Sequence, residues 1–188
     1  GIAAHLANAG VHVRLLDIIP DGSDDRNALA RGAIKRMLKA QPAPFMSTGA
    51  AGLVRPGNLE DDFDKLGSVD WVIEAIVENI EVKRNFFAAL DNIRPVRQIV
   101  STNTSGLPIN ELSRGRSDDF RQHFLGAHFF NPPRHMELLE IIPSVDTTVE
   151  LVEFFRAHIS KRLGKKSVLC KDTPSFIANR IGLANNFW

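Results

Sequence analysis

Short apolar segments with strand character alternate with helical patterns along most of this chain. Strand patterns are expected at residues 11–17, 69–75, 98–102 and 167–170, and helical patterns at 1–9, 26–40, 80–92 and 148–163. Strands that alternate with helices at this spacing pair in parallel, because each crossover helix returns the chain to the same end of the sheet. The pattern therefore predicts an α/β fold with a doubly wound, mostly parallel sheet.

Three other segments complete the expected organisation. Residues 42–57 are rich in Pro, Gly and Ser and are expected to form a loop. Residues 109–112 are expected to form a helical turn, and a further helix is expected to begin after Pro174. The sequence contains no internal repeat and no low-complexity tract.

Size and composition narrow the possible functions. A chain of 188 residues can bury one substantial core, and its net charge of +1 does not favour nucleic acid or an anionic membrane surface. No apolar run of about 20 residues is present to span a bilayer. The single cysteine, Cys170, excludes an internal disulfide and is typical of a reducing, cytoplasmic compartment. We expect no metal site, and the absence of Tyr excludes a tyrosine as general acid.

Both ends of the chain suggest a piece of a longer protein. The sequence begins with Gly1 rather than Met and leads directly into a helical pattern, with no strand or Gly-rich turn before it. The last helical pattern stops soon after it begins. We therefore expect a truncated chain that is poorly active by itself, and its start carries no information about a targeting signal.

The strongest chemical feature is a histidine and a glutamate inside two apolar runs. His128 lies in residues 126–130 and Glu140 in residues 138–142, with a proline-containing turn between them. If the two runs are strands and the turn centres near Arg134, His128 lies opposite Glu140 in an antiparallel hairpin. A carboxylate paired with an imidazole in an apolar setting can act as a general base. This pairing indicates an enzyme.

Asp17 is a candidate for cofactor binding. It ends a strand pattern that follows an Ala-rich helix, and in dinucleotide-binding βαβ units an acid at this place accepts a hydrogen bond from the ribose 2′-hydroxyl. An acid that caps the next turn is an equally good reading of Asp17 on these grounds alone. The glycine turn that would seat the pyrophosphate is not in this sequence.

Four ordered motifs together resemble the NAD-binding domain of 3-hydroxyacyl-CoA dehydrogenases. They are residues 70–78 (DWVIEAIVE), 101–105 (STNTS), the His128 to Glu140 hairpin, and residues 171–180 (KDTPSFIANR). The resemblance covers nearly the whole chain, and the NPPRH sequence at 131–135 looks most like the large bacterial members. It implies an enzyme of fatty-acid β-oxidation that oxidises (S)-3-hydroxyacyl-CoA with NAD, with a Rossmann-like domain at residues 1–174 and the start of a helical domain at 175–188.

The resemblance also implies roles for individual residues. His128 would be the general base and Glu140 its partner, while Ser105 and Asn179 would lie near the oxygen on C3 of the substrate and the nicotinamide. NAD contacts are implied for Asp17, Glu78, Lys83, Ser105 and Asn131. Without the resemblance, Ser105 reads as a turn residue, Asn179 as a polar residue early in a helix, Lys83 as part of an exposed helix face, and Glu74 and Glu78 as acids near a helix start.

One expected helix is strongly basic. It carries Arg26, Arg31, Lys35, Arg36 and Lys39. In the family, the helix after the second strand approaches the phosphates of CoA, so the resemblance suggests a docking face that includes Lys35, Arg36 and Lys39. A solvated helix face remains the simpler reading of the same residues.

Two other functions stay open at this point. A related enzyme could act on a CoA-free hydroxy acid such as a sugar acid, or a non-catalytic relative could keep the fold without binding cofactor. The Phe129–Phe130 pair and residues 172–180 favour the acyl-CoA reading. The resemblance further implies an acyl-CoA substrate and a homodimer formed through the helical domain.

Overall fold

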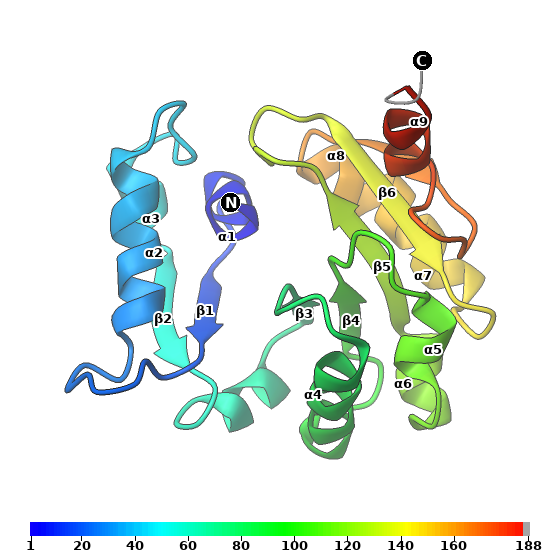
Figure 1. Cartoon of the computed structure of the whole chain (residues 1–188), viewed down its shortest axis with the longest axis horizontal. Coiled ribbons are helices and arrows are strands. Elements are labelled where there is room, and N and C mark those ends of the chain that lie inside the picture. The colour runs from blue at the N-terminus through cyan, green and yellow to red at the C-terminus, as the bar shows by residue number, and fades with distance from the viewer. Residues whose placement is uncertain (186–188) are drawn as a thin grey trace. The chain divides into compact units, whose positions relative to one another are not determined.

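The computed structural model describes residues 1–185, which divide into two compact units. The first unit comprises residues 1–65 and 130–137. Its elements are α1 (Ile2–Asn8), β1 (Val13–Asp17), α2 (Ala28–Lys39), α3 (Thr48–Ala51) and β2 (Val54–Asn58), shown in blue and cyan in Figure 1. β1 and β2 pair in parallel, from Val13 opposite Val54 to Asp17 opposite Asn58. The first unit therefore has a small parallel sheet with Asp17 at the carboxyl end of β1.

The core of the first unit is small. Ala4 and Ala7 of α1 pack with Phe45 and Val54, and partly buried residues of β1 and α2 surround them. The small alanines let α1 approach the sheet closely. Gly10 has a φ of +80°, a backbone conformation that costs glycine little, and it allows the chain to leave α1 and enter β1.

The expectation of a loop at residues 42–57 was wrong, because this segment contains α3 and most of β2. Pro56 and Gly57 lie inside β2, where Pro56 is opposite Leu15 and Gly57 is opposite Leu16. Within residues 1–185, β2 has a partner strand on one side only. A proline fits such a strand because its nitrogen, which has no hydrogen to donate, can face away from the partner.

The second unit comprises residues 66–129 and 138–188, of which residues up to 185 are described. Its strands are β3 (Trp71–Glu74), β4 (Ile99–Thr102), β5 (Phe124–Phe129), β6 (Leu138–Pro143) and β7 (Lys166–Leu169). They form one sheet in the order β3-β4-β5-β6-β7, and Figure 1 shows β4, β5 and β6 side by side. All neighbours are parallel except β5 and β6. The predicted Rossmann-like, mostly parallel fold is confirmed.

Helices connect and cover these strands. They are η1 (Phe63–Ser68, whose first residues lie in the first unit), α4 (Ile80–Ile93), α5 (Ile109–Ser113), α6 (Asp118–Gln122), α7 (Val149–Phe154), the π-helical segment η2 (Phe155–Ile159), α8 (Ser160–Arg162) and α9 (Ala178–Asn185). The helix expected at residues 148–163 thus contains a π-helical stretch in its middle. The short helix α6 was not expected from the sequence.

Aromatic residues hold the second unit together. The Phe87 ring of α4 lies 5.0 Å from the Phe124 ring of β5, and Phe120 of α6 stacks on Phe124 at 5.3 Å. On β5, Gly126 leaves room for α5, because a Cβ there would lie 2.9 Å from Cδ1 of Ile109. The loop before α5 is bonded to the carboxyl end of β5, because the Phe129 N–H donates to Oδ1 of Asn103 at 2.8 Å.

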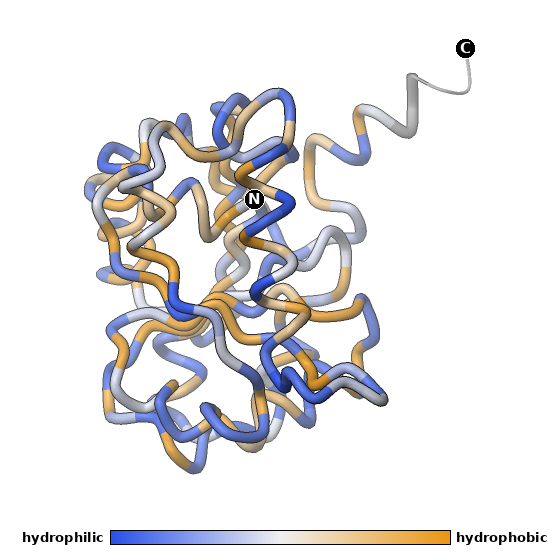
Figure 2. Tube along the Cα trace, turned by 90° about the vertical axis from the view of Figure 1, so that its left-hand side faces the viewer, coloured by the Kyte–Doolittle hydropathy of each residue, from blue (hydrophilic) through white to orange (hydrophobic). Residues whose placement is uncertain are grey.

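Hydropathy along the chain alternates over short distances. Figure 2 shows apolar stretches broken repeatedly by polar ones. Among residues 1–185, no helix combines the length and the apolar character needed to cross a bilayer.

Candidate active site

His128 and Glu140 lie directly opposite each other on β5 and β6, as the hairpin register predicts. Nδ1 of His128 is 2.8 Å from Oε2 of Glu140, and the two residues are only 5% and 1% exposed. A carboxylate oxygen accepts hydrogen bonds, so this contact places the imidazole proton on Nδ1 and leaves Nε2 as the basic nitrogen. The contact therefore fixes the orientation of the imidazole ring against the carboxylate.

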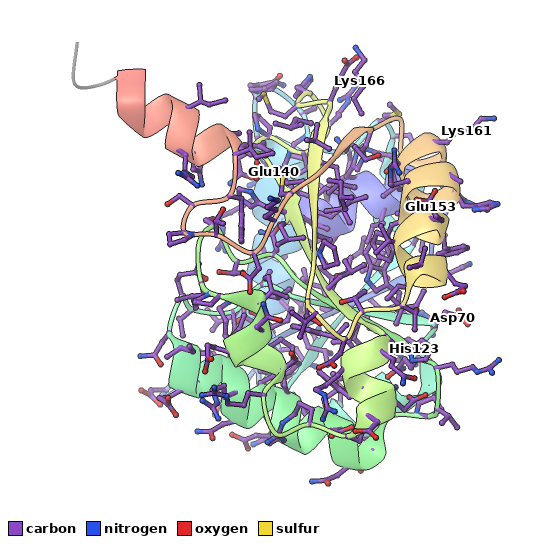
Figure 3. All side chains as sticks on the ribbon, turned by 90° about the vertical axis from the view of Figure 1, so that its right-hand side faces the viewer. Asp70, His123, Glu140, Glu153, Lys161 and Lys166 are labelled. Carbon is purple, nitrogen blue, oxygen red and sulfur yellow. The ribbon has the colours of Figure 1, made fainter. Side chains whose placement is uncertain are left out.

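The second oxygen of Glu140 is also bound. Oε1 accepts hydrogen bonds from the backbone N–H groups of Ile177 at 3.1 Å and Ala178 at 2.8 Å, at the start of α9. Figure 3 shows Glu140 inside the fold, whereas Glu153 and Lys161 extend from the outer helix. A buried carboxylate is costly unless it is hydrogen-bonded, and these donors meet that requirement.

Cys170 lies close to the same carboxylate. Burial, followed by the negative charge of Glu140 and a hydrogen bond to it, raises the pKa of the Cys170 thiol to about 12. The side chain is buried and forms no disulfide. Cys170 is thus a neutral thiol at physiological pH, and it adds no second negative charge beside Glu140.

The chain approaches α9 through an unusual turn. Ser175 and Phe176 have φ values of +61° and +50°, in the left-handed region that side chains rarely adopt. The buried Phe176 ring lies 6.0 Å from the His128 ring. Upstream, the Asp172 carboxylate accepts hydrogen bonds from the backbone N–H groups of Ile109 and Asn110 at 2.8 and 2.9 Å. Contacts at both ends therefore hold the segment before α9 in place.

A pocket of about 590 Å³ lies near this turn in the second unit. It is lined by Glu78, Ser105, Gly106, Leu107, Ser175, Asn179 and Gly182. Asn179 Nδ2 donates to the carbonyl of Ser105 at 3.3 Å, and the Ser105 N–H donates to Oε1 of Glu78 at 2.9 Å. Three residues singled out from the sequence, far apart along the chain, are thus joined at one pocket.

Glu78 is held as a carboxylate. Burial acts to raise the pKa of Glu78, but hydrogen bonds from the Thr104 hydroxyl and the Ser105 N–H, together with the charge of Lys83, outweigh it and lower the pKa below its ordinary value. The side chain is 46% exposed. At neutral pH, Glu78 therefore presents a negative charge and hydrogen-bond acceptors at the pocket.

Lys83 lies inside the protein and not on an exposed helix face. Its Nζ is 2.6 Å from Oε1 of Glu74, 3.3 Å from Oε2 of Glu78 and 3.3 Å from the carbonyl of Ile76. The sequence interpretation treated Glu74 as an acid near a helix start. The structure shows that its carboxylate also accepts hydrogen bonds from the Ile76 N–H and from the Thr102 hydroxyl. No local pattern signals this role, because Lys83 and the Thr102 hydroxyl come from separate elements, α4 and β4.

The remaining candidates lie in the first unit. Asp17 is exposed at the end of β1, where Oδ1 accepts the N–H of Ile18 at 2.9 Å. Asn131 lines a pocket of about 330 Å³ together with Gly1, Pro44, Pro132, Pro133 and Arg134. The turn that holds Asn131 is fastened within this unit, since Arg134 donates to the carbonyl of Ala43 at 2.6 Å.

Of the five basic residues expected on one helix, Arg26 lies before α2, which begins at Ala28. The five residues differ in whether they form ion pairs. Arg26 pairs with Glu60 and Asp61, and Arg31 with Asp25. Lys35, Arg36 and Lys39 are exposed and form no ion pair within residues 1–185. These three cations are the ones available to an anionic ligand.

Comparison with known proteins places these observations in a family. The family model described as 3-hydroxyacyl-CoA dehydrogenase, NAD binding domain, matches residues 1–173. A probable 3-hydroxyacyl-CoA dehydrogenase of Bacillus subtilis is 50% identical over 97% of this chain and 25% of its own length. A protein of Deinococcus radiodurans with the same description is 47% identical over 97% of this chain and 53% of its own length. The chain thus spans a quarter to about half of these relatives.

Solved structures agree. The crystal structure of 3-hydroxybutyryl-CoA dehydrogenase from Escherichia coli matches with a TM-score of 0.80 and 30% identity, over 96% of this chain and 37% of that one. The crystal structure of FadB2 from M. tuberculosis matches with a TM-score of 0.81 and 28% identity, over 96% of this chain and 62% of that one. The resemblance drawn from the four sequence motifs is confirmed.

Proposed function

We propose that this chain is the cofactor-binding part of an (S)-3-hydroxyacyl-CoA dehydrogenase of fatty-acid β-oxidation. It belongs to the 3-hydroxyacyl-CoA dehydrogenase family, whose NAD-binding domain it matches. The observation that carries the proposal is the buried contact of 2.8 Å between His128 Nδ1 and Glu140 Oε2. This contact orients one basic nitrogen and supplies a negative charge behind it. Oxidation of a secondary alcohol requires such a base, because the hydroxyl must lose its proton as hydride leaves carbon.

In this proposal, Nε2 of His128 takes the proton from the 3-hydroxyl group of the substrate. The imidazolium that forms is stabilised by Glu140, which also holds the ring in the reactive orientation. The backbone N–H groups of Ile177 and Ala178 bind the other oxygen of Glu140 and so help to hold the carboxylate in place. Ser105 and Asn179 orient the substrate from the pocket that they line.

The residues present fit NAD, whose nicotinamide supplies the hydride acceptor when bound. Asp17 offers an exposed carboxylate at a strand end, the place suited to a ribose hydroxyl. Glu78 offers an ionised acceptor at the pocket rim, and Asn131 a polar side chain in its own pocket. Lys83 is assigned to the cofactor site together with Glu78, its ion-pair partner.

The other parts of the proposal concern substrate and setting. Lys35, Arg36 and Lys39 are exposed cations, which supports docking of the CoA phosphates on α2. The buried, unpaired Cys170 supports a reducing, cytoplasmic location. We further propose an acyl-CoA substrate and a homodimer for the whole enzyme.

Replacement of His128 by Gln in the intact enzyme tests the central proposal. We expect kcat for oxidation of a 3-hydroxyacyl-CoA to fall at least about 10²-fold, the low end for a positioned general base. His123→Gln is the matched control, because His123 bonds the carbonyl of Asp119 away from the pocket. NADH formation measures the rates. A His128→Gln enzyme with most of its activity would refute the role.

The substrate class is tested separately. Replacing Lys35, Arg36 and Lys39 together by Gln should raise KM for acyl-CoA and leave KM for a CoA-free hydroxy acid unchanged. Faster turnover of a free hydroxy acid than of an acyl-CoA would favour the sugar-acid alternative. The third reading, a relative that keeps the fold without binding cofactor, is tested by titrating the intact protein with NADH. Binding seen by fluorescence would exclude that reading.

A further inference from the structure

We propose that the N-terminal end of α9 positions the catalytic pair, because the backbone N–H groups of Ile177, just before the helix, and of Ala178, its first residue, hold the Glu140 carboxylate against His128. This inference rests on the proposed acid/base role of His128 and Glu140. It adds a positioning element that lies 37 and 38 residues beyond Glu140 in the chain.

The two oxygens of Glu140 have different hydrogen-bond partners. Oε2 faces His128 Nδ1 at 2.8 Å, and Oε1 accepts both backbone N–H groups. A carboxylate held at one oxygen only can rotate about its last bond, and Oε2 would then leave the plane of the imidazole. Two donors on Oε1 prevent this rotation, so they act on His128 through Glu140.

Helix geometry makes these two donors available. The carbonyl of Ile177 accepts the hydrogen bond from the Ile181 N–H at 3.0 Å, so Ile177 caps the helix and Ala178 is its first residue. The N–H groups at the start of a helix have no partner within the helix. Here the N–H groups of Ile177 and Ala178 find their acceptor in Oε1 of Glu140.

The left-handed turn at Ser175 and Phe176 aims the donors. Two consecutive non-glycine residues at positive φ are energetically unfavourable and persist only where the surrounding structure holds them. Phe176 is buried beside the His128 ring, and Asp172 anchors the segment to α5. The strained turn therefore lies next to the catalytic pair. Its backbone conformation directs the N–H groups of Ile177 and Ala178 toward Glu140.

Ala178→Pro in the intact enzyme removes one of the two donors. Proline is well accepted at the first position of a helix, so the helix itself should form. We expect kcat to fall roughly tenfold, as for loss of a hydrogen bond to a charged group, with KM for NAD and for acyl-CoA within about twofold of wild type. Ala178→Gly, the control, changes the side chain but keeps the N–H group, and it should retain at least half of the wild-type kcat.

A double-mutant cycle separates positioning from simple loss of structure. In a Glu140→Gln background, Ala178→Pro should lower kcat by less than about twofold, because the N–H group acts through the Glu140 carboxylate. An equal loss of kcat in both backgrounds, or an unchanged kcat in Ala178→Pro alone, would overturn the inference. If Glu140→Gln itself left kcat unchanged, the proposed acid/base pair would be wrong instead.

Amide hydrogen exchange tests the contact even if Ala178→Pro does not fold. In Glu140→Ala, the Ala178 amide should exchange at least about tenfold faster than in wild type, because its acceptor is gone. The Ile181 amide, which bonds to Ile177 within the helix, is the internal reference and should change little. Equal exchange of the Ala178 amide in both proteins would contradict the contact.

Discussion

Lys83 and Glu74 form a buried ion pair, with Nζ 2.6 Å from Oε1 and side chains that are 1% and 0% exposed. Both oxygens of Glu74 are hydrogen-bonded, since the carboxylate also accepts from the Ile76 N–H and the Thr102 hydroxyl. Through its contact with Glu78, Lys83 links the interior of the second unit to the pocket rim. Its position close to Glu78 suggests that it supports the pocket from within.

Lys83→Met should strongly destabilise the intact protein, by about 3–5 kcal/mol, because it leaves the Glu74 charge buried without its partner. The double variant Lys83→Met with Glu74→Gln should recover at least half of that loss, since no uncompensated charge remains. Urea denaturation measures both, with the exposed Lys161→Met as control. A double variant that is less stable than Lys83→Met would contradict the assignment.

The ionisation of Glu78 should make the free energy of unfolding depend on pH in the acid range. Its pKa in the folded protein is lowered, so its contribution is present above the ordinary pKa of a glutamate and is lost as the pH falls through the lowered value. The stability advantage of wild type over Glu78→Gln should therefore shrink on titration from about pH 7 to about pH 3. An advantage that stays constant over this range would refute the prediction.

The ionisation of Cys170 should make the free energy of unfolding depend on pH in the alkaline range. Its pKa is raised from 9.0 to about 12, so the unfolded chain releases the thiol proton at lower pH than the folded one. The stabilisation is complete below the ordinary pKa and is lost as the pH rises toward the raised value. Chemical denaturation at a series of pH values from about 8 to 11 should show a decline in wild type that is weaker in Cys170→Ala. If the free energy of unfolding falls equally with pH in wild type and in Cys170→Ala, the prediction is wrong.

Ser175→Gly should stabilise the fold, by about 0.5–1 kcal/mol, because glycine accepts the φ of +61° that strains a serine. Gly10→Ala is the matched reverse change. Gly10 has a φ of +80° and open space around it, so an added methyl group should destabilise through the backbone alone. Thermal unfolding of both variants checks the opposite signs. A lower melting temperature for Ser175→Gly would show that the turn is not strained.

Local patterns in the sequence were sufficient for much of the fold. Alternating strand and helix periodicities identify the order of most elements, since side-chain spacing records local backbone geometry. The register of His128 opposite Glu140 follows from two apolar runs placed symmetrically about Arg134. The loop expected at residues 42–57 failed for the same reason, because Pro56 and Gly57 indicate a turn locally and only pairing with β1 makes them a strand.

The sequence by itself thus determined the α/β class and the hairpin that sets His128 opposite Glu140. Only the tertiary structure decided that Lys83 is buried against Glu74 and that the N–H groups of Ile177 and Ala178 hold Glu140. Contacts of this kind join residues whose separation along the chain follows no periodicity. They form because burial leaves a charged group no solvent, and the nearest donor or counter-charge in the packed structure must replace it.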